Sequence, residues 1–121
     1  MNYKDKFYAN YVSTHITPRK GNANLNEFGQ RAIVYQKQFG KFLPKEKNVK
    51  IIDLGCGNGS IVWWLQHIGL TNACGIDVSA EQVEIAKRLG VNNIEQADIK
   101  EFLKDKKDFY DVIFARDIIE H

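Results

Sequence analysis

The sequence predicts an α/β fold in which a mainly parallel sheet is covered by helices. Short apolar, β-branched runs alternate with segments of helical period over residues 49–115. The first of these runs ends in a cluster of glycines, as expected where a buried strand turns sharply into a helix. Such alternation implies parallel strands joined by right-handed crossovers, with ligands bound at the carboxyl ends of the strands.

Residues 1–45 are expected to form an N-terminal helical segment and cap. The aromatic residues within 1–25 follow no sustained period, which favours a short helix and an irregular loop. Residues 26–42 carry apolar side chains at three- and four-residue steps, and this spacing predicts a helix that is ended by Pro44.

Residues 46–121 are expected to form a second, Rossmann-like domain. Strands are predicted at 49–54, 73–78, 93–97 and 111–115, and helices at 61–68, 79–90 and 98–103. Ser79 and Gln82 show the spacing of a capping box, and Asp98 can cap the last of these helices. We therefore expect a three-layer sandwich with about four strands in its sheet.

Composition limits the classes of function. Hydrophobic residues make up 44% and charged residues 26% of the 121 residues, which is ordinary for one globular domain. The formal net charge of +2 comes from scattered Lys and Arg, so nucleic acid is not expected as a partner. Cys56 and Cys74 lack metal-ligand spacing, and no apolar stretch approaches the roughly 20 residues of a membrane span. We expect a cytoplasmic protein with reduced thiols.

The sequence DLGCGNGS at residues 53–60 is the centre of the predicted site. Its glycines at 55, 57 and 59 permit a sharp reversal and let a ligand approach the backbone, including Cys56 and Asn58. A nicotinamide dinucleotide site usually has its third glycine where Ser60 stands. Asp53 would repel a pyrophosphate, but it can balance an α-amino group, so this segment favours S-adenosylmethionine over NAD.

Two further acids end the next two predicted strands. The oxygens of Asp77, in GIDVS, can accept both hydroxyls of a ribose. Asp98, in QADI, can accept the exocyclic amino group of adenine while Val78 and Ile99 flank the ring. Each acid also fits a plain structural role, Asp77 as a helix N-terminal acid and Asp98 as a helix cap.

The segments DLGCGNGS, GIDVS, QADI and FYDVIFARDIIEH resemble, in order and spacing, the cofactor motifs of class I S-adenosylmethionine-dependent methyltransferases. The resemblance covers about residues 49–121. It implies that Asp53 and the glycine turn hold the methionine part, Asp77 the ribose and Asp98 the adenine, and that Ala115 and Arg116 lie beside the sulfonium. Because class I members have seven-stranded sheets, it also implies a partial chain, truncated after about the fourth strand, with a Rossmann-like domain that is incomplete at its C-terminus. The predicted cofactor residues are Asp53, Gly55, Cys56, Gly57, Asn58, Gly59, Asp77, Val78, Ala97, Asp98, Ile99, Ala115 and Arg116.

His121 is the predicted catalytic base, because a hydroxyl acceptor must lose a proton as the methyl group is transferred. DIIEH at the end of the chain is similar to the ExxEH segment of ubiquinone-pathway and small-RNA 2′-O-methyltransferases, where acids and histidine can hold a divalent metal. Asp117, Glu120 and His121 fit a metal site, a base with its orienting carboxylate, or a solvated helix start. We predict no metal.

The resulting hypothesis is an S-adenosylmethionine-dependent methyltransferase that methylates a small molecule or sugar-type acceptor at oxygen. The sugar-type acceptor follows only from a likeness of YANYVSTH, residues 8–15, to methyltransferases of polysaccharide pathways. The expected partners are the small-molecule acceptor and a second copy paired through the exposed sheet edge, without nucleic acid or membrane. Two alternatives stay open: an NAD(P)-binding reductase domain, although no Tyr-x-x-x-Lys pair follows, and a non-catalytic nucleoside-binding module.

Overall fold

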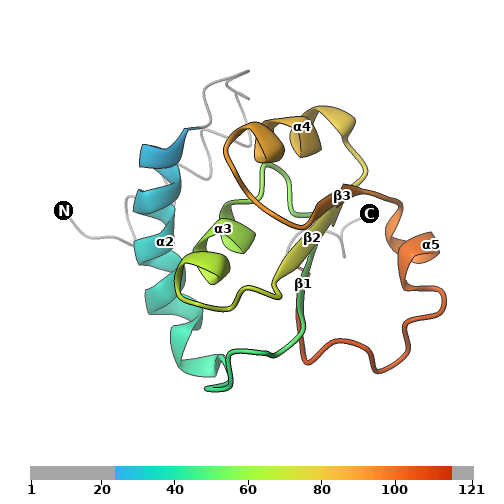
Figure 1. Ribbon diagram of the computed structural model, residues 1–121, viewed down its shortest axis with the longest axis horizontal. Coiled ribbons are helices and arrows are strands. Elements are labelled where there is room, and N and C mark those ends of the chain that lie inside the picture. Colours follow the sequence, from blue (N-terminus) through green and yellow to red (C-terminus); the bar gives the residue numbers. More distant parts are fainter. Residues whose placement is uncertain (1–23, 116–121) are drawn as a thin grey trace.

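The computed structural model describes residues 24–115 of the chain, and residues 1–23 and 116–121 lie outside the described part. The described residues form a parallel sheet with helices on both faces (Figure 1). The predicted α/β fold is confirmed. In chain order the elements are α2 (Leu25–Phe39), the short 3-10 helix η1 (Gly40–Phe42), β1 (Ile51–Leu54), α3 (Ser60–His67), β2 (Cys74–Asp77), α4 (Ala80–Arg88), β3 (Ile94–Gln96), α5 (Ile99–Leu103) and β4 (Val112–Phe114).

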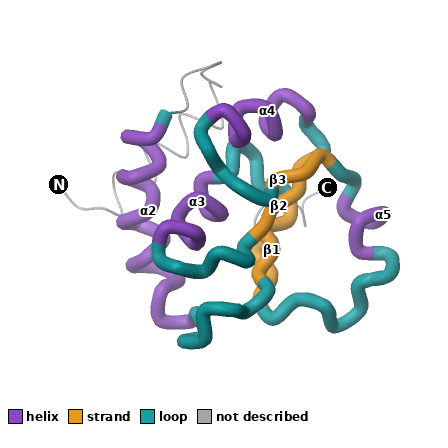
Figure 2. The backbone as a smooth tube through the Cα atoms, viewed as in Figure 1, coloured by secondary structure: helices purple, strands orange, loops and turns teal. Residues whose placement is uncertain are grey.

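The sheet has the strand order β3-β2-β1-β4, and every neighbouring pair of strands is parallel. The chain steps outward from β1 to β3 and then returns to the other side of β1, so the order reverses beside the central strand (Figure 2). Asp53 of β1 is in register with Gly75 of β2 and Phe114 of β4. All four carboxyl ends therefore meet at one edge, which is the edge where ligands bind in open α/β sheets.

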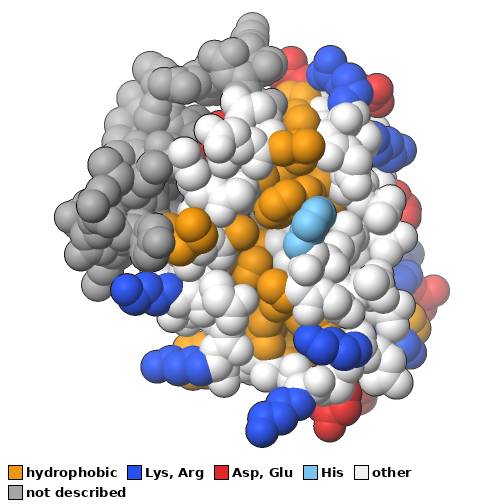
Figure 3. All heavy atoms as spheres, turned by 60° about the vertical axis from the view of Figure 1, so that its left-hand side comes forward, with side chains coloured by type: hydrophobic (Ala, Val, Ile, Leu, Met, Phe, Trp, Pro, Cys, Tyr) orange, Lys and Arg blue, Asp and Glu red, His pale blue; other side chains and the backbone are white. Residues whose placement is uncertain are grey.

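The two faces of the sheet are covered unequally. Helices α2, α3 and α4 cover one face, and their buried side chains share one cluster with Ile51 and Phe114 of the sheet. The other face carries a smaller cluster of Ile52, Leu54 and Ile76, against which α5 packs. Figure 3 shows hydrophobic side chains gathered in a band on the side of the molecule that carries α2.

Helix α2 joins the same core as the sheet. Its Phe28 and Tyr35 are fully buried, and the ring of Phe28 lies 5.7 Å from that of Trp63 in α3. Trp64 is buried and Trp63 is half-buried, so both side chains take part in packing. Helix α2 thus packs on α3, which covers the sheet. The division of the chain into two domains at residue 45 stays a prediction.

The helix starts follow their capping residues. The side chains of Asn24, Ser79 and Asp98 accept hydrogen bonds from backbone N–H groups three residues on, in α2, α4 and α5 respectively. The predicted capping box is only half formed, because the N–H of Ser79 donates to Asp77 Oδ1 instead of to the side chain of Gln82. The N–H of Ser79 is therefore bonded to Asp77, the residue that ends β2.

Candidate cofactor-binding site

The glycine loop between β1 and α3 is pinned to the neighbouring strand. Gly55, Gly57 and Gly59 have φ angles of 74°, 57° and 88°, which residues with a Cβ rarely adopt. The N–H groups of Gly55 and Cys56 both donate to the carbonyl oxygen of Ile76, at 2.8 and 2.9 Å. The loop is therefore held at the carboxyl edge of the sheet before any ligand arrives, with its glycine positions bare of side chains.

Asp77 at the end of β2 is the polar centre of this edge. Its Oδ2 accepts from the N–H of Gly57 and its Oδ1 from the N–H of Ser79, both at 2.8 Å. Each carboxylate oxygen has more than one acceptor position, so two bonds to the backbone still leave room for hydroxyl donors. The carboxylate of Asp77 therefore has a structural role in holding the loop and the start of α4. Its binding of a ribose stays a prediction.

Asp53 lies in the interior of the protein. It is 1% exposed in the central strand, and its charge is the second cause, after burial itself, of the raised pKa of the Cys56 thiol. A carboxylate beneath the loop can act on a bound cation through its field. Direct contact between Asp53 and an α-amino group stays a prediction.

The side chain of Cys56 faces the core. It is 3% exposed, and a Cβ added to Gly75 would lie 2.8 Å from the Cβ of Cys56, so the missing side chain of Gly75 makes room for it. Its thiol donates to the carbonyl of Gly57, and burial raises its pKa. Any contact between Cys56 and a cofactor is therefore left to its backbone. Burial also raises the pKa of Cys74.

Val78, Ala97 and Asp98 lie together at the same edge. Val78 is 71% exposed, so its apolar side chain is accessible at this edge. The N–H of Ala97 donates to the carbonyl of Asp77, which ties the ends of β2 and β3 together. Asp98 caps α5 through Oδ1, and Ile99 packs against the smaller cluster. The structure thus brings together the residues predicted to surround the nucleoside.

Several of the predicted residues are not placed at this edge by the structure. Arg116, Asp117, Glu120 and His121 lie outside residues 24–115, as does the segment 8–15, and Ala115 packs against the smaller cluster. Within the described part, no group of His, Cys, Asp and Glu is arranged to hold a metal ion. His67 stacks on Trp63 with ring centroids 3.9 Å apart, as expected of a structural histidine.

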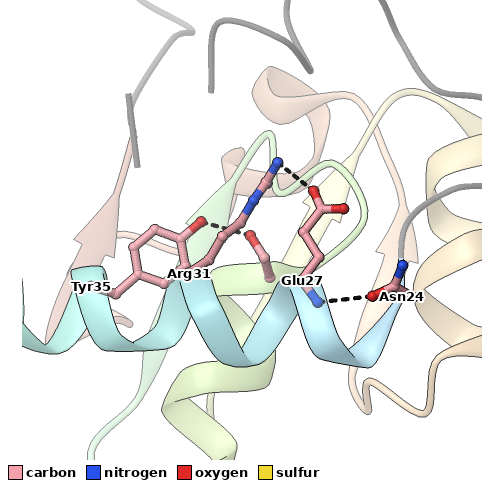
Figure 4. Close-up of polar contacts among 5 residues, drawn as sticks. Asn24, Glu27, Arg31 and Tyr35 are labelled. Carbon is pink, nitrogen blue, oxygen red and sulfur yellow. Dashed lines mark hydrogen bonds and ion pairs between the residues drawn. The ribbon is translucent and has the colours of Figure 1, made fainter. Parts of the chain in front are cut away.

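One contact of the site was missed at the level of sequence. The hydroxyl of Tyr35 in α2 is 2.8 Å from Ser60 Oγ, the first residue of α3 after the glycine loop (Figure 4). Tyr35 lies within the helix predicted over residues 26–42, and Ser60 stands where a dinucleotide site usually has its third glycine. The available signal was the hydroxyl itself, since a buried tyrosine needs a hydrogen-bond partner.

Comparison with known proteins decides the family. A family profile described as a methyltransferase domain matches residues 25–121, which is most of the chain. The chain belongs to the methyltransferase domain family. The match confirms the resemblance drawn from the motifs, and S-adenosylmethionine as the cofactor of the family.

Curated relatives are longer than this chain. Ubiquinone biosynthesis O-methyltransferase of Pelagibacter ubique (strain HTCC1062) is 40% identical over 79 residues, which cover 62% of this chain and 32% of the relative. Ribosomal protein L11 methyltransferase of Lactobacillus johnsonii (strain CNCM I-12250 / La1 / NCC 533) is 33% identical over 72 residues, covering 57% and 23%. The chain spans about a third or less of the length of these relatives.

A solved structure supports the fold. The SAM-dependent methyltransferase from Anabaena variabilis ATCC 29413 aligns with a TM-score of 0.55 and 22% identity, over 95% of this chain and 49% of that one. At this identity the likeness shows the fold alone. None of the helices within residues 24–115 has the length and apolar character needed to cross a membrane.

Proposed function

We propose that this methyltransferase domain binds S-adenosylmethionine at the carboxyl edge of its sheet and serves methyl transfer to oxygen on a small-molecule or sugar-type acceptor. The observation that carries the proposal is the Asp77 carboxylate, which is fixed by Gly57 and Ser79 beside the exposed Val78. The name of the 40% identical relative, an O-methyltransferase of ubiquinone biosynthesis, supports oxygen as the accepting atom.

The residues at this edge fit the chemical groups of the cofactor. Glycines at 55, 57 and 59 leave the loop backbone accessible, and Asp77 suits a ribose because a carboxylate accepts hydrogen bonds from paired hydroxyls. Val78 offers an apolar surface to the adenine ring, and Asp98 keeps Oδ2 for its exocyclic amino group. When bound, S-adenosylmethionine supplies a methyl group on a positively charged sulfur, so holding the acceptor in line is a large part of catalysis.

The acceptor side of the reaction rests on the sequence. His121 is proposed as the base for a hydroxyl acceptor, and Asp117 and Glu120 as its neighbours on the same turn. The predicted cytoplasmic location stays a prediction. A homodimer through the sheet edge does too, and β4 is the edge strand at which it would form.

The test is a calorimetric titration of the protein and of Asp77→Ala with S-adenosylmethionine, S-adenosylhomocysteine and NADH. We expect both sulfur compounds to bind the unaltered protein, and Asp77→Ala to weaken them by about tenfold or more, because charge-assisted hydrogen bonds are worth ~1.5–3 kcal/mol. Glu84→Ala, which removes an exposed acid from α4, is the matched control and should bind normally. Binding of NADH alone would instead identify a dinucleotide site, and failure of both sulfur compounds to bind would refute the proposal.

A further inference from the structure

The hydroxyl groups of Tyr35 and Ser60 form a buried bridge between two helices. Tyr35 is 1% and Ser60 3% exposed, and their oxygen atoms are 2.8 Å apart (Figure 4). Tyr35 belongs to α2 and lies 25 residues before Ser60 in the chain. Because both side chains are buried, loss of either hydroxyl leaves the other without this partner in a place that water does not readily reach.

The bridge ends at a helix start that differs from the others described. The first residues of α2, α4 and α5 are each capped by a side chain, whereas α3 is preceded by Gly59, which has no side chain to cap with. The first-turn N–H groups of a helix lack partners within the helix. Ser60 is the residue in that turn with a hydroxyl, and the hydroxyl points to Tyr35.

The start of α3 is hydrogen-bonded to the second half of the glycine loop, whose first half is held by Ile76. The N–H of Trp63 donates to the carbonyl of Gly59 at 2.8 Å, and the N–H of Gly59 donates to the carbonyl of Cys56 at 3.0 Å. Any movement of Ser60 is therefore passed through Gly59 to the loop. The nucleoside end of the site is also held from outside the loop, because the N–H of Ser79 donates to Asp77 Oδ1 and the N–H of Ala97 donates to the carbonyl of Asp77.

We propose that Tyr35 is a positioning residue of the cofactor site: its bond to Ser60 fixes the start of α3 so that the loop and the first helical turn hold the amino-acid part of S-adenosylmethionine. The inference rests on the proposed function. According to this inference, α2 affects how tightly the amino-acid part of the cofactor is bound, but not its nucleoside part. It does so through Tyr35, which acts on the site by way of Ser60.

The experiment compares S-adenosylhomocysteine with 5′-methylthioadenosine, which keeps the nucleoside but lacks the amino-acid part. Tyr35→Phe removes only the hydroxyl. We expect it to weaken S-adenosylhomocysteine about fivefold, the effect of one hydrogen bond, and to leave 5′-methylthioadenosine within about twofold. Ser60→Ala should give the same selective loss, and the double variant should lose no more than either single variant, because the two side chains act through one bond.

Gln36→Leu is the matched control. It removes a second hydrogen bond between α2 and α3, which runs from Trp64 Nε1 to Gln36 Oε1 over 3.1 Å. A change that only loosens the contact of the two helices should lower the unfolding temperature without altering the ratio of the two affinities.

Three results overturn the inference. If Tyr35→Phe weakens both compounds equally or neither of them, or if Gln36→Leu shifts the ratio as much, Tyr35 has only a structural role. Should Tyr35→Phe fail to fold, Ser60→Ala decides by the same ratio. If the unaltered protein binds neither compound, the proposed function falls first and the inference falls with it, a result distinct from equal loss in a protein that binds both.

Discussion

Glycines near the site are required for different physical reasons. Gly59 has a φ of 88°, and a Cβ there would also lie 3.3 Å from Ala86 and from Val91. Gly75 has an ordinary backbone, but a Cβ there would lie within 3.0 Å of Cys56 and Val62. Gly90 has a φ of 85° and open space around it. A side chain at Gly90 would therefore meet backbone strain alone, one at Gly75 close packing alone, and one at Gly59 both.

Gly59→Ala and Gly90→Ala should therefore differ in cost. A residue with a Cβ in the left-handed region costs roughly 1–2 kcal/mol, and tight packing adds about 1 kcal/mol or more. We expect the free energy of unfolding to fall by about 2–4 kcal/mol for Gly59→Ala and by about 1–2 kcal/mol for Gly90→Ala, measured by urea denaturation. Equal losses would show that Ala86 in α4 and Val91, before β3, move aside without cost when Gly59 gains a Cβ.

At this scale the sequence could identify residue types but not tertiary neighbours. The acids at 77 and 98 follow predicted strands, so their common edge could be predicted from chain order and parallel topology. The inward turn of Cys56 could not, because it depends on the absence of a side chain at Gly75, 19 positions on. The bond between Asp77 and the N–H of Gly57 could not be predicted either, because it joins residues 20 positions apart in the chain.

The elements were predictable because their signals are local. Apolar runs and capping residues placed the strands and the helices α3, α4 and α5 within about two residues of their observed bounds, whereas the helix predicted over residues 26–42 ends at Phe39 and is followed by η1. The register of the strands is not local, and β4 shows how it is fixed. Lys50, just before β1, donates its N–H to Asp111 Oδ2 at 2.8 Å, and its carbonyl accepts from the N–H of Asp111. A side chain thus aligns the amino ends of two strands that lie far apart in the chain.

Asp111→Ala should destabilise the sheet without weakening cofactor binding. The variant loses one hydrogen bond to the backbone of Lys50, so we expect the free energy of unfolding to drop by about 1 kcal/mol. The affinity for S-adenosylhomocysteine should stay within about twofold, because the amino ends of the strands are opposite the proposed site. Asp105→Ala, at an exposed ion pair, is the control and should change neither quantity. A selective loss of affinity in Asp111→Ala would contradict the separation of the two edges.

The whole molecule is held mainly from one side of its sheet. Helix α3 buries five of its eight residues, Ser60, Ile61, Val62, Trp64 and Leu65, within the layer formed with α2 and α4. Helix α5, on the opposite face, has five residues and none of them is fully buried. Because local stability follows the apolar area that opening exposes, the two faces should open independently and at different free energies.

Amide hydrogen exchange under native conditions tests this asymmetry at two matched positions. The N–H of Trp63 in α3 donates to Gly59 at 2.8 Å, and that of Phe102 in α5 donates to Asp98 at 2.9 Å; each is a bond from the first turn to the residue before the helix. Corrected for intrinsic rates, Phe102 should exchange at least about tenfold faster, a difference of ~1.4 kcal/mol in opening free energy. Equal protection at the two amides would mean that the sheet opens as one cooperative unit, and that the sparse second face is held by the first.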